Sequence, residues 1–217
     1  MIFQDRSDAG RRLAIALASY REPEPMVFGI GTGGVMVAAE VAQALHAPLD
    51  VLLTRHIPLP GFPEFAIGAI APEALVLDHQ VMRVLGVDRS YVDHAAATEK
   101  AKLEATGRLF RRARPASSMS RRPVLLIDDG SATASAAEAA VRSARRQGAS
   151  LIVYAAPVWP PHHAATLRDD VDELVCLYYP NEPAPAARWY RAFPPVAETE
   201  VVEVLERFNN RAFSPTR

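Results

Sequence analysis

The stretch that decides the fold is Leu125-Leu126-Ile127-Asp128-Asp129-Gly130-Ser131-Ala132-Thr133. The apolar run from Val124 to Ile127 predicts a buried strand, and the acidic pair and small residues after it predict a loop. Similar strand patterns alternate with helical patterns along the chain, which is typical of βα units. We therefore predict an α/β fold with a mostly parallel sheet flanked by helices. Ligands of such sheets bind beyond the carboxyl ends of the strands, so this loop is a candidate site.

The other elements are predicted from periodicity and from proline and glycine positions. Strands are expected over 26–30, 49–53, 75–77, 124–127, 151–155 and 174–177, and helices over 8–20, 35–46, 90–112, 134–147 and 198–208. Three prolines between Ile57 and Pro63 predict an irregular loop, and Pro157 is expected to end the strand over 151–155. No composition shift marks a linker, so a single domain over 1–217 is predicted.

Bulk composition excludes several classes of protein. With 49% hydrophobic residues, the 217-residue chain can bury a substantial core. A net charge of -1 argues against nucleic acid as a main partner, and the arginines at 111–114 and 121–122 are expected to be solvated. No apolar run has the length of a membrane span, and no signal core follows Met1, so a cytoplasmic protein is expected. The lone Cys176 is expected to be a buried strand thiol.

The adjacent carboxylates of Asp128 and Asp129 are the first candidate for chemistry. They are not expected in the core, because burying a charge is costly unless it is paired. They fit acceptors for sugar hydroxyls, or for Mg²⁺ held mainly through water. The alternative is an acidic loop in which one aspartate caps a helix.

Small residues follow this acidic pair and lead into a helix. Backbone N–H groups in such a loop can close on an anion, and the helix N-terminus favours negative charge. Ser135 and Glu138 also fit a capping box. A second loop of this kind, Gly31-Thr32-Gly33-Gly34, lies between another strand and helix. Two such loops suggest two anionic groups on one ligand, as in a sugar that carries a phosphate and a pyrophosphate.

The stretch from Leu125 to Thr133 resembles the phosphoribosyl pyrophosphate (PRPP) motif of type I phosphoribosyltransferases. The chain most resembles a bacterial subgroup of that family with unassigned substrate. The shared motifs are Phe3-Gln4-Asp5-Arg6, Ala9-Gly10-Arg11-Arg12-Leu13, Pro60-Gly61-Phe62-Pro63-Glu64-Phe65-Ala66-Ile67-Gly68-Ala69 and Trp189-Tyr190-Arg191-Ala192-Phe193. The resemblance implies a mostly parallel sheet flanked by helices with a small hood region, and a homodimer.

The resemblance also implies roles for individual residues. Asp128 and Asp129 would face the ribose hydroxyls and hold Mg²⁺ through water, and Arg55 and His56 stand where the family has a basic pair near the pyrophosphate. Apart from the resemblance, the loop position of His56 and the near-neutral pKa of a free histidine make it a candidate catalytic acid or base. The 5′-phosphate would lie on Ala132, Thr133, Ala134, Ser135 and Ala136, and the pyrophosphate on Thr32, Gly33 and Gly34 beside Arg55. The reaction would displace pyrophosphate from C1 of PRPP by an acceptor that the sequence does not identify.

Several residues depart from the family pattern. Ala134 stands where the family usually has glycine, and Ala136 lacks the usual hydroxyl. Thr32 replaces an arginine of close relatives, and His56 replaces a lysine, so fixed positive charge is lost. One alternative is therefore a transfer-deficient member that binds a sugar phosphate or nucleotide, or that performs phosphorolysis or hydrolysis. Another is a regulatory module. Trp189 and Tyr190 can stack on an aromatic acceptor or pack in the core, and His162-His163 are expected in an exposed loop.

Overall fold

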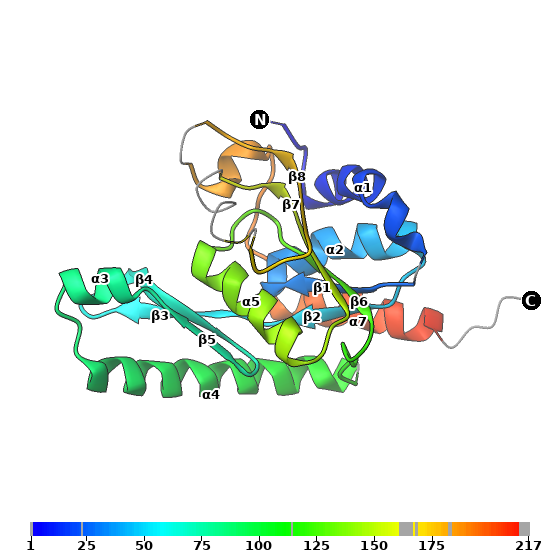
Figure 1. The fold of residues 1–217 in the computed structure, drawn as a ribbon. Helices are drawn as coiled ribbons and strands as arrows, with labels where there is room; N and C mark the ends of the chain where they lie inside the picture. The colour runs from blue at the N-terminus through cyan, green and yellow to red at the C-terminus, as the bar shows by residue number, and fades with distance from the viewer. Residues whose placement is uncertain are drawn as a thin grey trace, which may run out of the picture.

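Figure 1 shows a computed structural model of the chain. It describes residues 2–22, 24–113, 115–160, 167, 169–181 and 184–212, with only the backbone of residues 210–212. The main sheet is parallel, with strand order β2-β1-β6-β7-β8. Its strands are β1 (Met26–Ile30), β2 (Leu49–Leu52), β6 (Pro123–Ile127), β7 (Leu151–Val158) and β8 (Glu173–Tyr178). The predicted α/β fold is confirmed, and the predicted strands match within a few residues.

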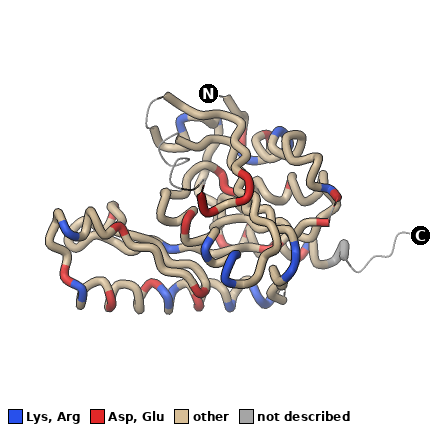
Figure 2. The backbone as a smooth tube through the Cα atoms, in the orientation of Figure 1, with Lys and Arg blue, Asp and Glu red and all other residues tan. Residues whose placement is uncertain are grey.

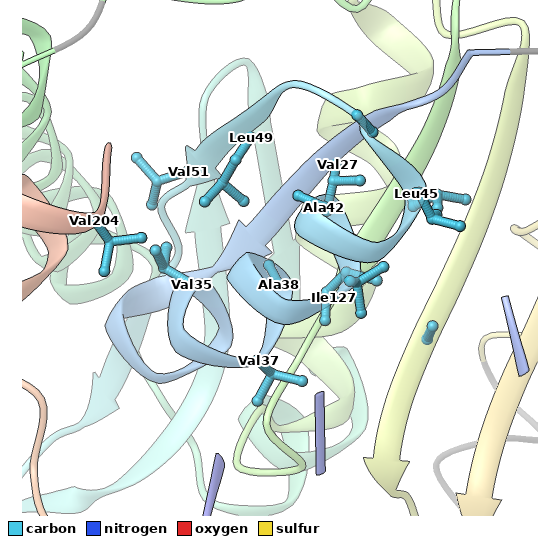
Figure 3. Close-up of a cluster of buried hydrophobic side chains, with 14 of the residues drawn as sticks. Val27, Val35, Val37, Ala38, Ala42, Leu45, Leu49, Val51, Ile127 and Val204 are labelled. Carbon is cyan, nitrogen blue, oxygen red and sulfur yellow. The ribbon is translucent and has the colours of Figure 1, made fainter. Parts of the chain in front are cut away.

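Helices cover both faces of this sheet, because its strands are buried on both sides. Val27, Leu125 and Ile127 point to one face, where α1 (Arg6–Ala16), α2 (Gly31–Leu45), the end of α4 (Arg89–Ala113) and α7 (Glu198–Ala212) pack on them. Figure 3 shows Val27, Ala38 and Ile127 within this cluster. Alternate residues of the same strands, such as Leu126, point to the other face and pack on α5 (Ala134–Arg146).

The strand order places a switch point between β1 and β6. From β1 the chain continues to β2 on one side, and from β6 it continues to β7 on the other side. The two connections diverge and leave a crevice at the carboxyl ends of β1 and β6, where ligands of such sheets bind. The N-termini of α2 and α5 both lie at this edge, one after each strand.

A second sheet is antiparallel, with order β3-β4-β5, and projects beside the main sheet in Figure 1. Its strands are β3 (Arg55–Leu59), β4 (Phe62–Ala71) and β5 (Ala74–Leu77), so the predicted loop over 57–63 is wrong. Pro58 lies at a register shift, and Pro63 lies in the part of β4 that does not pair with β5. Proline is tolerated there because its missing N–H is not needed for the ladder. The short helix α3 (His79–Val84) follows β5.

The antiparallel sheet is docked on α5 through small side chains. Buried alanines of β4 and β5 contact Ala136 and Ala139 of α5. Ser143 of α5 donates a hydrogen bond of 2.6 Å to the carbonyl of Pro72 in the β4–β5 turn. The interface therefore joins the antiparallel sheet to the helix that starts at the candidate loop. It also explains the methyl group of Ala136, which is 1% exposed and fills space in this interface.

A buried ion pair joins the main sheet to α4. Asp50 of β2 is 0% exposed and accepts a 2.8 Å hydrogen bond from Arg111 near the end of α4. The N–H of Ser117 donates to the same carboxylate at 2.8 Å. The expectation that Arg111 is solvated is therefore wrong, because its charge compensates Asp50. Elsewhere on α4, acidic and basic residues are interspersed, as Figure 2 shows.

Two further boundaries differ from the sequence prediction. The first helix ends at Ala16, and the 3-10 helix η1 (Ala18–Arg21) follows it. Pro157 does not end β7, which runs to Val158. Ala155 accepts from the N–H of Asp128, so Pro157, two residues on, faces the side where β6 has already ended. No helix in the described ranges is long and apolar enough to cross a membrane.

The alanine interface predicts the effect of a larger side chain at Ala139. Ala139→Leu should lower the free energy of unfolding by about 1–3 kcal/mol, because three added carbons find no space at a residue that is 0% exposed. Ala101→Leu on the exposed face of α4 is the matched control and should change stability by less than about 0.5 kcal/mol. Urea unfolding of both variants tests this, and equal stabilities would contradict the interface.

Candidate functional site

The acidic pair at the end of β6 is buried. Asp128 and Asp129 are each 1% exposed, so the expectation that these carboxylates stay out of the core is wrong. The physical reason is that three of their four oxygens accept hydrogen bonds within the protein. Burial of a carboxylate is tolerated when its hydrogen-bonding capacity is satisfied in this way.

The two carboxylates fold the loop that follows them. Asp128 Oδ2 accepts from the N–H groups of Gly130 at 3.0 Å and Ala132 at 3.3 Å. Asp129 Oδ1 accepts from the N–H of Ser131 at 3.1 Å and also from its hydroxyl. Gly130 has φ +90°, which a residue with a side chain rarely adopts. The pair thus uses the N–H groups of residues 130–132 to close a tight turn.

The next three N–H groups are left for a ligand. Thr133 is the N-cap of α5, and its hydroxyl accepts from the N–H of Ala136 at 3.2 Å, so the predicted capping box at Ser135 is wrong. Among the described residues, the N–H groups of Thr133, Ala134 and Ser135 have no hydrogen-bond partner. The loop lines a cavity of about 300 Å³, which is closed on its other side by Pro160, residues 184–187 and Phe193. This geometry suits an anion at the positive end of a helix.

The glycine segment after β1 is the first turn of α2 and not a loop, which corrects the prediction. The N-cap residue Ile30 gives no side-chain hydrogen bond to the first turn. A Cβ on Gly33 would lie 2.0 Å from Asp129 Oδ2, and one on Gly34 would lie 2.6 Å from the carbonyl of Ile127. These glycines therefore let α2 approach the end of β6, and Thr32 stands beside them in the same turn.

Arg6 contacts the acidic pair from the start of α1. Its Nε donates to Asp129 Oδ2 at 2.9 Å, and its Nη1 donates to the carbonyl of Pro194 at 2.7 Å. Its guanidinium carbon lies 3.7 Å from the centroid of the Phe193 ring. The sequence contained the signal, since Arg6 and Phe193 belong to motifs at the two ends of the chain, but 123 residues separate Arg6 from Asp129.

The aromatic side chains of the C-terminal motif pack against other rings, and Phe193 among them also lines the cavity. The ring of Tyr190 lies against Phe3 and Phe193, and its hydroxyl donates to the carbonyl of Asp129 at 2.8 Å. Trp189 contacts the ring of Tyr178. The packing alternative for these two residues therefore describes the structure. His162 and His163 lie outside the described residues.

Arg55 and His56 lie at the start of β3 and serve a different contact. Arg55 donates to Glu99 of α4 at 2.7 Å. Burial and the neighbouring charge of Arg55 lower the pKa of His56, which favours a neutral ring at pH 7. Among the described residues, no hydrogen bond or ion pair joins either side chain to the two loops. Neither residue provides a fixed cation in contact with the glycine turn.

Cys176 behaves as an inert strand thiol. It lies on β8, is partly buried, and donates to the carbonyl of Tyr178 at 3.2 Å. Burial raises the pKa of this thiol to about 12, so it stays protonated at neutral pH.

The described residues do not form a direct metal site. No cluster of three or more His, Cys, Asp or Glu side chains occurs among them. The oxygens of Asp129 are occupied by Arg6 and Ser131, and Oδ2 of Asp128 is occupied by two N–H groups. Since Mg²⁺ requires accessible oxygen ligands, the acidic pair as folded does not fit direct coordination.

The carboxyl group of Asp128 has a raised pKa. Burial, and then the charge of Asp129, raise the pKa of Asp128 to about 8. Burial and the charge of Asp128 also raise the pKa of the neighbouring Tyr154 hydroxyl above its usual range. Asp129 is paired with Arg6. The raised pKa therefore favours a protonated Asp128 near neutral pH, as is common for one of two carboxyls that share a site.

The raised pKa of Asp128 predicts a pH dependence of stability. Between its unfolded value of 3.8 and about 8 the folded state binds more protons than the unfolded state, so stability falls as pH rises. Asp128→Asn keeps an acceptor oxygen but does not titrate. The stability of the unsubstituted chain, relative to this variant, should be highest near pH 4 and fall through about pH 8. Urea unfolding over this range tests it, and parallel pH profiles would contradict it.

The close approach of α2 predicts the effect of a methyl group at Gly33. Gly33→Ala should cost about 1–3 kcal/mol of unfolding free energy, because the added carbon meets Asp129. Gly107→Ala in α4 is the control, since the nearest atom to its added carbon is 3.9 Å away, and it should stabilise by about 0.5–1 kcal/mol. Thermal unfolding measures both, and a neutral Gly33→Ala would show that the turn has spare room.

Comparison with known proteins identifies relatives over nearly the whole chain. No protein-family model matches it. The chain is 38% identical over 207 residues to the "Putative phosphoribosyl transferase Rv0571c" of Mycobacterium tuberculosis, which covers 95% of this chain and 47% of that protein. A protein of the same description from another strain of that organism matches equally well. The chain therefore spans about half the length of the curated relatives that it matches.

A solved structure has the same fold. The crystal structure of TT1426 from Thermus thermophilus is 37% identical, with a TM-score of 0.80, over 96% of this chain and 99% of that one. Three findings agree on one family: the resemblance of the acidic motif, the architecture of the fold and these similarities. The chain belongs to the phosphoribosyltransferase family.

Proposed function

We propose that the chain binds PRPP, or a related ribose 5-phosphate compound, at the carboxyl ends of β1 and β6 and reacts at its anomeric carbon. The observation that carries the proposal is the set of three unpartnered N–H groups of Thr133, Ala134 and Ser135, at the N-terminus of α5 and beside a cavity of about 300 Å³. Three unpartnered amides at a helix N-terminus suit a phosphate group. The proposal includes an acceptor, which the sequence does not identify, and a homodimeric assembly.

The acidic pair supports this function because it shapes the loop over residues 130–135, which we call the phosphate loop. Its oxygens accept from the N–H groups of residues 130–132. The next three N–H groups lie at the N-terminus of α5, where a helix leaves them without partners of its own. A ribose bound with its phosphate on these amides would lie next to Asp128 and Asp129, whose carboxyl groups can form hydrogen bonds with its hydroxyls. Small shifts in the buried pair would be needed for that contact.

We propose that Mg²⁺ binds together with PRPP and not to the free chain. Since three of the four carboxylate oxygens are engaged and both residues are 1% exposed, the acidic pair as folded does not fit direct coordination of the ion. We expect Mg²⁺ to bind through phosphate oxygens of the ligand, where it would neutralise negative charge. The free chain should then show no Mg²⁺ binding in calorimetry.

A second candidate is a family member that binds the sugar phosphate without efficient release of pyrophosphate. The observation that favours it is the placement of the cations: Arg55 is paired with Glu99, and Thr32 brings no charge to the first turn of α2. A pyrophosphate there would meet backbone N–H groups and little fixed positive charge. Similar affinities for ribose 5-phosphate and PRPP, with no pyrophosphate release, would support this candidate.

A charge at Thr133 tests the phosphate loop. Thr133→Asp keeps an N-cap acceptor, so the fold should be preserved, but its negative charge would repel a phosphate. We expect the affinity for ribose 5-phosphate and for PRPP with Mg²⁺ to fall at least about tenfold, a loss on the order of 1.4 kcal/mol. Isothermal titration measures both, and a pyrophosphate assay with candidate acceptors tests transfer.

The control for this variant is Ser90→Asp, which adds the same charge in the exposed first turn of α4. It should leave both affinities unchanged. Failure of the unsubstituted chain to bind either ligand would reject the proposed function. Unchanged binding by Thr133→Asp would place the phosphate elsewhere.

A further inference from the structure

Arg6 joins three parts of the chain at one point. It is the first residue of α1, and its side chain is 11% exposed. Its guanidinium donates to Asp129 and to the carbonyl of Pro194, and lies over the ring of Phe193. A guanidinium held by an ion pair, a carbonyl and an aromatic face has little rotational freedom. Its position is therefore fixed by the N- and C-terminal segments together.

This fixed guanidinium determines how Asp129 is oriented. Arg6 takes Oδ2 of the carboxylate, and Ser131 takes Oδ1. A carboxylate held at both oxygens cannot rotate about its last bond without breaking one contact. Since the Ser131 contact is part of the turn over residues 130–132, the orientation of Asp129 is coupled to the turn that precedes the free N–H groups.

Arg6 also lies beside the first turn of α2. A Cβ on Gly33 would be 3.2 Å from Arg6 Nε. Among the described residues, Arg6 is the basic side chain that forms an ion pair with the acidic pair, whereas Arg55 is paired with Glu99. An anionic ligand next to two carboxyls would be repelled unless a cation offsets their charge. Arg6 has the position and the permanent charge to do so.

We infer that Arg6 is a positioning residue for ligand binding: it orients Asp129, and through it the phosphate loop, and offsets the negative charge beside the bound anion. This inference rests on the proposed function. Arg6 thus has a role at a site whose Asp129 lies 123 residues further along the chain. Arg6 acts through Asp129, so its effect on binding should depend on Asp129.

The test compares Arg6→Met and Arg6→Lys, with Arg12→Met as the control. Arg12 lies on the same helix, pairs with Asp8 at 2.9 Å, and stacks over Phe3, but it does not contact Asp129. Calorimetric titration with ribose 5-phosphate should show an affinity at least about tenfold weaker for Arg6→Met, and about twofold or less for Arg12→Met. Arg6→Lys should restore part of the loss, because it keeps the charge but loses the fork of donors.

A double-mutant cycle distinguishes positioning from general damage to the fold. In an Asp129→Asn background, Arg6→Met should weaken binding by only about threefold or less, because its partner is already altered. Equal losses in both backgrounds, or no recovery in Arg6→Lys, would overturn the role. If the unsubstituted chain binds ribose 5-phosphate and Arg6→Met binds it equally well, the role of Arg6 is overturned but the proposed function is not. No binding by the unsubstituted chain would overturn the proposed function and this role with it.

Discussion

The structure of the site depends on the burial of two adjacent carboxyl groups at the end of β6. Because Asp128 and Asp129 are 1% exposed, their oxygens must find donors inside the protein. The nearest donors are the N–H groups of the residues that follow, and these bonds set the turn over 130–132. The free N–H groups of the first turn of α5, which an α-helix leaves without partners of its own, follow directly after that turn. The same carboxyls thus explain both the local fold and the place of the anion site.

The ends of the chain complete this arrangement. Phe3, Tyr190 and Phe193 form an aromatic cluster, and Tyr190 donates to the backbone of Asp129. Arg6 reaches the side chain of the same residue across this cluster. The motifs at the two ends of the sequence therefore share one structural task, which is to hold Asp129 from its backbone and from its carboxylate. On the other side of the site, α5 is braced by the alanine interface with the antiparallel sheet.

The fold was largely predictable from the sequence, because the buried parallel strands are short apolar runs bounded by small residues and prolines. The strand at Met26–Ile30 agrees fully with the prediction. Errors arose where backbone geometry depends on distant neighbours. The prolines of β3 and β4 are tolerated only through a register shift and an unpaired strand end. The glycines at 33 and 34 lie in a helical turn, and their lack of a side chain lets α2 approach the end of β6.

The candidate site was predicted in position but not in its internal contacts. A strand that ends in two aspartates and a loop of small residues located it. Burial of the aspartates was missed, because the compensating Arg6 lies 123 residues away and no local pattern pairs them. The departures at Thr32 and His56 were visible in the sequence. Their meaning required the structure, which commits Arg55 to Glu99 and leaves Arg6 beside the glycine turn.

A crystal structure of the chain with ribose 5-phosphate tests the central claim most directly. The phosphate oxygens should lie about 2.7–3.2 Å from the N–H nitrogens of Thr133, Ala134 and Ser135. The ribose should lie beside Asp128 and Asp129, with Arg6 still paired to Asp129. A phosphate bound away from α5, or an acidic pair that keeps its contacts while the sugar lies elsewhere, would contradict the account.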